Sequence, residues 1–63
     1  MIRFNIRQYN ELTKEYTHIG MSVGDSFEIK NNRILVKLDN NLVGIINFKE
    51  MIEDDKDYYT LYV

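Results

Sequence analysis

Five carboxylate side chains lie within eight residues near the end of the chain: Glu50, Glu53, Asp54, Asp55 and Asp57. Hard cations such as Ca²⁺ bind several carboxylate oxygens at once, so such a run invites a metal interpretation. Lys56 interrupts the run, and the alternating ligand spacing and central Gly of a calcium loop are missing. The sequence therefore favours a solvated acidic segment, with no metal and no cofactor.

The same carboxylates could instead form a surface that binds another protein. Closely spaced carboxylates imitate a row of phosphates and can occupy a basic groove on another protein. Neighbouring tyrosines would extend this surface, because a tyrosine contributes a large rigid ring with a polar tip. We therefore expect binding to a host protein with a basic surface through Glu50, Glu53, Asp54, Asp55, Asp57, Tyr58 and Tyr59.

Catalysis has little support in the sequence. His18 is the only histidine, there is no Cys, and the serines near Gly24 lack the strand–turn–helix context of an activated nucleophile. Val23-Gly24-Asp25 lacks the further glycines and the Lys of a phosphate-binding loop. We expect a binding protein and not an enzyme.

The net charge of −2 is unevenly distributed. Residues 1–37 carry six Lys/Arg and four Asp/Glu, whereas residues 38–63 carry two Lys and six Asp/Glu. A strongly basic footprint is therefore missing, and nucleic-acid binding is the second hypothesis. It would use Arg3, Arg7, Arg33 and Lys37, with base stacking on Tyr9 or Phe48. A third hypothesis is an oligomeric sponge that buries a nucleotide-like small molecule between subunits.

The elements that position these residues are expected to be mainly β-strands. Ile2, Phe4 and Ile6 alternate with polar residues, which predicts a strand over about 2–9. A second strand is expected over 13–19, with a helical turn over 9–14 as the alternative. Gly20 and Gly24 are expected to break the pattern where the backbone turns.

Three further runs, 26–30, 33–39 and 42–48, are separated by Asn31-Asn32 and Asn40-Asn41, which predicts a meander with two-residue type I′ turns. Symmetric pairing about these turns opposes Phe27 to Val36 and Val36 to Ile45. The predicted core is Ile2, Phe4, Ile6, Phe27, Ile29, Ile34, Val36, Leu38, Val43 and Ile45.

The same register places Leu35, Ile46 and Phe48 on the face opposite the core. We expect this face to form a homo-oligomer interface, because a short chain without disulfide or metal gains from covering apolar surface. The alternative is that the first or the last strand covers it within a monomer. Residues 49–54 are expected to form one helical turn, and 58–63 a final strand.

These elements describe a single mainly β domain over residues 1–63. Five to six short strands with one helical turn before the last strand predict a small SH3-like or OB-like barrel. No run of apolar residues approaches a membrane span and the N-terminus alternates, so we expect a cytoplasmic protein. In size and in its richness in Asn, Ile and Lys, the chain resembles small accessory proteins of phages and other mobile elements, many of which bind and block a host factor.

Overall fold

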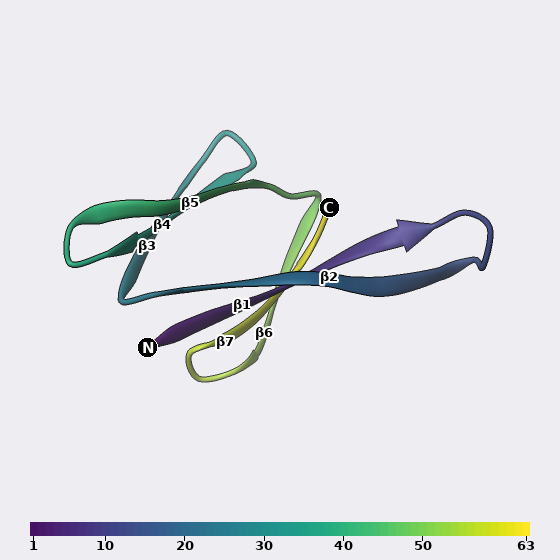
Figure 1. Ribbon diagram of the computed structural model, residues 1–63, viewed down its shortest axis with the longest axis horizontal. Helices are drawn as coiled ribbons and strands as arrows, with labels where there is room; N and C mark the ends of the chain where they lie inside the picture. The colour runs from purple at the N-terminus through teal and green to yellow at the C-terminus, as the bar shows by residue number, and fades with distance from the viewer.

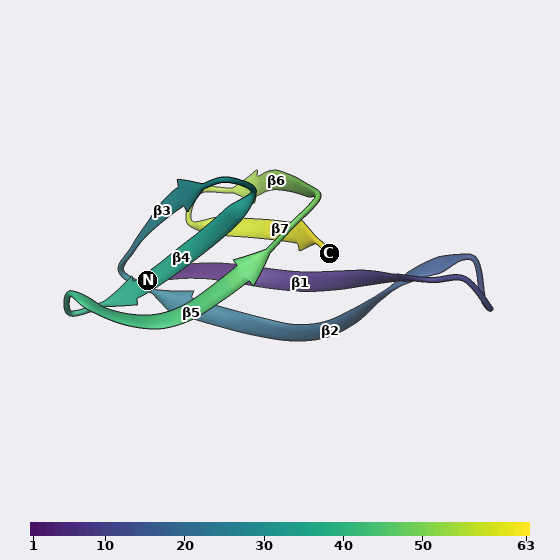
Figure 2. The ribbon, with the colours of Figure 1, turned by 90° about the horizontal axis from the view of Figure 1, so that it is seen from above.

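A computed structural model describes residues 1–63 as seven strands in two layers (Figures 1 and 2). The strands are β1 (Ile2–Asn10), β2 (Glu15–Gly24), β3 (Ser26–Lys30), β4 (Arg33–Leu38), β5 (Asn41–Asn47), β6 (Glu50–Asp55) and β7 (Tyr58–Tyr62). One sheet has the order β2-β1-β7-β6 and the other β3-β4-β5. The structure contains no helix long and apolar enough to cross a membrane.

The first and last strands lie side by side at the centre of the four-stranded sheet. β1 and β7 are parallel, and Phe4 is level with Tyr59. The far half of the β1–β2 hairpin extends beyond the second sheet as an arm (Figure 1), which contributes to an elongated shape of 39 × 23 × 15 Å. The side chain of Asn10 holds the tip by accepting the backbone N–H groups of Leu12 and Thr13.

A small aromatic core joins the two sheets. Four side chains are fully buried, namely Phe4, Ile34, Val36 and Leu61. The Phe4 ring stacks on Tyr59 and meets Phe27 edge-on, each with a centroid distance of 5.3 Å. Around them pack Ile2, Phe27, Ile46, Phe48, Met51 and Tyr59. Because so few side chains are fully enclosed, each contributes a large share of the stability.

The predicted β3–β4 pairing is confirmed, since Phe27 opposes Val36 across a turn in which Asn31 and Asn32 have φ of 51° and 61°. The predicted β4–β5 register is wrong by one residue. Asp39 and Asn40 form the turn, and Ile45 opposes Leu35. Since side chains alternate along a strand, a register that differs by one residue turns each of these β5 side chains to the opposite face from the one predicted. Gly44 and Ile46 therefore point inward, and Ile45 points outward.

Two contacts far apart in sequence explain the observed register. The carboxylate of Asp25 accepts the backbone N–H of Asp39 at 3.0 Å, which fixes the start of the turn. Gly44 then faces β2, where a Cβ atom would lie 3.0 Å from Ser22 Oγ. The close approach of β5 to β2 is compatible with Gly at this inward position, whereas the predicted register would have turned Val43 and Ile45 inward.

The structure corrects the predicted core and the predicted second face; the shift accounts for Val43, Ile45, Ile46 and Phe48, whereas Ile29 keeps its predicted partner Ile34 and is still exposed. Ile29, Val43 and Ile45 are more than half exposed, and Ile46 and Phe48 pack against the core. Leu61, which was not predicted as core, is fully buried. Leu35, Ile46 and Phe48 therefore do not share one face.

Three further expectations differ from the structure. The seven strands form two separate sheets and no closed barrel. Residues 49–54 form no helical turn, because Glu50–Asp55 pairs with β7 and thereby satisfies its backbone groups, which a single helical turn would leave largely unpaired. No glycine has positive φ. Gly20 lies inside β2, where the strand runs to residue 24 instead of 19.

Candidate functional site

The acidic segment forms a β-hairpin at one edge of the four-stranded sheet. We call β6, β7 and their turn the acidic hairpin; its carboxylates are Glu50, Glu53, Asp54, Asp55 and Asp57. β6 is the edge strand, and a bulge at Asp54 accompanies the turn, in which Asp57 has a φ of 63°. Charged side chains on an edge strand also discourage pairing with other chains. All five carboxylates are exposed.

Hydrogen bonds hold three of these carboxylates in place. Asp54 accepts the hydroxyl of Thr60, Asp55 accepts the backbone N–H of Lys56 at 2.7 Å, and Glu53 accepts the hydroxyl of Tyr59 at 3.1 Å. Desolvation of the Tyr59 hydroxyl, followed by this bond to Glu53 and the negative charges nearby, raises the pKa of Tyr59 above 10.0. Each carboxylate keeps free acceptor capacity, because two oxygens offer about four lone-pair sites.

Four of the five tyrosines lie on the outer face of the four-stranded sheet. Tyr58 and Tyr62 alternate with the inward-facing Tyr59 and Leu61. We call this surface the tyrosine face; its tyrosines are Tyr9, Tyr16, Tyr58 and Tyr62. Tyr16 contacts both Tyr9 and Tyr62, with ring centroids 5.3 Å and 4.7 Å apart. In the sequence, the signal for this face is the period-2 alternation of β1 and β7, which becomes informative once the two strands are known to be neighbours.

Two hollows on the tyrosine face connect it to the acidic hairpin. The larger one, of about 600 Å³, is open and is lined by Asn5, Asp54, Asp55, Tyr58 and Thr60. The smaller one, of about 180 Å³, is lined by Tyr16, Glu50, Ile52 and Tyr62. Both combine carboxylate oxygens with an aromatic wall. This combination suits a Lys or Arg side chain, whose charge pairs with a carboxylate while its stem or its cationic head lies on a ring.

Arg3 of the chain itself shows the aromatic part of this contact. Its guanidinium donates to the Tyr58 hydroxyl at 2.8 Å and lies 5.4 Å from the centre of that ring. Of the predicted partner-binding residues, Glu50, Asp54, Asp55 and Tyr58 thus line the hollows. Glu53 and Tyr59 bond to each other beside the core, and Asp57 occupies the turn.

The residues proposed for nucleic-acid binding lie on two different sheets. Arg3, Arg7 and Tyr9 belong to β1, in the four-stranded sheet, whereas Arg33 and Lys37 belong to β4, in the other sheet. Leu35 lies beside Arg33 and Lys37 on the outer face of that second sheet. The five residues therefore do not form one surface.

The only histidine and the serines are not joined in the structure. His18 lies exposed on β2, opposite Arg7, and makes no hydrogen bond to a serine. No three His, Asp or Glu side chains are grouped as ligands for a metal ion. Comparison with protein-family models, with curated proteins and with solved structures finds no match to this chain.

Proposed function

We propose that this protein is a non-enzymatic binding module that attaches to a partner protein with a basic surface and blocks it. The acidic hairpin and the tyrosine face would make the contact. The observation that carries the proposal is that carboxylates and tyrosine rings line the same two hollows on one side of the molecule. Partner Lys and Arg side chains would enter these hollows, and the exposed rings of Tyr9 and Tyr16 would add contact area.

Long-range attraction would favour the same orientation. The carboxylates of the hairpin are exposed, and only Lys56 offsets them within the hairpin. Charges of one sign at an exposed tip steer an oppositely charged partner toward that tip and speed association. A nucleic-acid partner would be repelled from this side. Such binding therefore has less support than binding to a protein.

The test replaces four carboxylates by amides of the same shape in one variant: Glu53→Gln, Asp54→Asn, Asp55→Asn and Asp57→Asn. The amides keep hydrogen-bond acceptors for Thr60 and Tyr59, and Asn tolerates the positive φ of residue 57. Wild-type protein should retain a specific protein from a host lysate, and the quadruple variant should bind it at least ~10-fold more weakly, with an unchanged melting temperature.

The control variant, Glu11→Gln with Glu15→Gln, removes two carboxylates from the arm and should bind like wild type. Equal binding by the quadruple variant, or an equal loss in the control, would contradict the proposed surface.

A further inference from the structure

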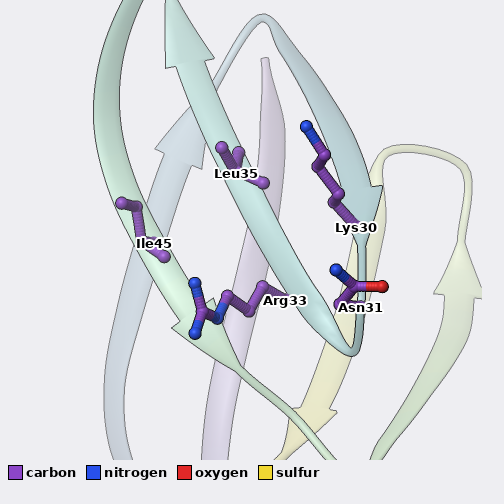
Figure 3. A pocket seen from close by; sticks show the side chains of 5 residues that line it. All are labelled: Lys30, Asn31, Arg33, Leu35 and Ile45. Atoms are coloured by element: carbon purple, nitrogen blue, oxygen red, sulfur yellow. The ribbon is translucent and has the colours of Figure 1, made fainter.

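The outer face of the three-stranded sheet carries an uncompensated cationic cluster. Lys30 and Arg33 are direct cross-strand partners at the end of the β3–β4 hairpin. Neither forms an ion pair; the single salt bridge of the molecule joins Lys37 to Glu28 on the same face, at 3.5 Å. Side chains opposite each other in a sheet have Cβ atoms about 5 Å apart. The two side chains therefore start side by side, although Figure 3 shows their charged heads pointing apart, so contact of both with one anionic group requires a rotation of the Lys30 or Arg33 side chain.

These two cations line a hollow that also has two apolar side chains in its wall. It has a volume of about 250 Å³ and is lined by Lys30, Asn31, Arg33, Leu35 and Ile45. Figure 3 shows Arg33 reaching from β4 toward β5 with its guanidinium beside Ile45, and Lys30 reaching toward the level of Leu35. Ile45 is 58% exposed, although it is a large apolar side chain in a sheet. The observed β5 register accounts for this surface, because it places Ile45 on the outer face beside Leu35.

We propose that this hollow binds a small organic phosphate. The phosphate would contact Arg33 and Lys30, and the apolar or planar body of the ligand would lie on Leu35 and Ile45. Arginine suits this role because its planar guanidinium donates two parallel hydrogen bonds to phosphate oxygens. The volume is below the usual range of drug-sized pockets, so the ligand is a small one, of the size of a mononucleotide or less. The site lies on the opposite sheet from the tyrosine face and is independent of the protein-binding proposal.

The experiment titrates the isotope-labelled protein with adenosine 5′-monophosphate at low salt and follows the backbone amide signals. Inorganic phosphate and adenosine are titrated separately. We expect the monophosphate to shift the amides of Lys30, Arg33, Leu35 and Ile45. It should bind more tightly than either fragment. Shifts confined to β1 and β7, no shifts at all, or equal affinity for inorganic phosphate would overturn the proposal.

Two variants assign the two halves of the site. Arg33→Gln keeps most of the side-chain length and should weaken the monophosphate ~10-fold, the usual scale for one charge-assisted contact. Ile45→Asn changes an exposed side chain and should weaken the monophosphate while leaving inorganic phosphate unaffected. Lys56→Gln removes one positive charge from the acidic hairpin and should change neither. Equal affinity in Arg33→Gln and wild type, or far tighter binding of a single-stranded oligonucleotide to the same amides, would refute a small-molecule site.

Discussion

At the scale of single residues, two glycines in one strand have opposite roles. Gly24 lies where β2 meets β4, and a Cβ atom there would overlap the carbonyl oxygen of Lys37 and approach Val36 Cγ1 to 2.6 Å. Gly20 has no atom within 4 Å of the same position. Neither glycine has positive φ, so the requirement at Gly24 is for space and not for backbone freedom.

We therefore predict that Gly24→Ala destabilises the protein by about 1–3 kcal/mol or more, because neither the backbone carbonyl nor the buried Val36 can move aside cheaply. Gly20→Ala is the matched control, with an expected change within about 0.5 kcal/mol. Urea denaturation of both variants measures the difference. Similar losses in the two variants would show that the sheets do not approach each other at Gly24.

The raised pKa of Tyr59 predicts how stability changes in alkali. Well below pH 10.0, Tyr59 is protonated in both folded and unfolded chains, and its full contribution is present. As the pH rises from there through the folded pKa, the unfolded chain loses the proton first, so the free energy of unfolding falls. Tyr59→Phe keeps the ring and should remove this part of the decline. Unfolding free energies above pH 10.0 that fall equally in both proteins would contradict the assignment.

At the scale of elements, local patterns predicted where most strands lie but not how they associate. Alternation placed β1, β3 and β7 correctly, and Asn31-Asn32 fixed one turn because Asn tolerates positive φ. The β5 register depends on the bond from Asp39 to Asp25, 14 residues away, which no local pattern contains. β6 became a strand because β7 was available to pair with it.

The candidate site was likewise predictable only in the part that is local in the sequence. The acidic run is visible in the sequence, since its members are neighbours along the chain. The tyrosine face depends on the parallel pairing of β1 with β7, whose partners Arg3 and Tyr58 are 55 positions apart. Likewise, the hollow beside Arg33 depends on the outward position of Ile45. Symmetric pairing about an Asn40-Asn41 turn predicted the opposite orientation for this side chain.

The register can be tested with two adjacent residues on β5. Ile46→Asp would place an unpaired carboxylate against the core, which costs several kcal/mol and should unfold so small a domain. Ile45→Asp places the same group on the outer face and should leave a folded protein. Circular dichroism and thermal melting distinguish the two states. Unfolding by Ile45→Asp together with tolerance of Ile46→Asp would restore the register expected from the sequence.

At the scale of the whole molecule, the carboxylate cluster and the Lys30–Arg33 pair lie on different sheets. The acidic hairpin and tyrosine face form one side, whereas Lys30, Arg33 and Lys37 surround Leu35 and Ile45 on the other. With four fully buried side chains, the chain gains from any partner that covers apolar surface. The homo-oligomer expected from the sequence would now use Leu35 and Ile45, because Ile46 and Phe48 pack against the core.

The charge arrangement predicts how such self-association responds to salt. A two-fold contact through Leu35 and Ile45 would bring the cations of both copies together, opposed only by Glu28, so repulsion should disfavour the dimer at ~0.05 M salt. Screening at ~0.5 M salt should strengthen the dimer while it weakens partner binding by the acidic hairpin. Sedimentation velocity at both salt concentrations measures the mass, and Leu35→Lys, which adds charge to the apolar centre, should remain monomeric at each. A monomeric wild type throughout, or a dimer that Leu35→Lys leaves intact, would exclude this face as the site of self-association.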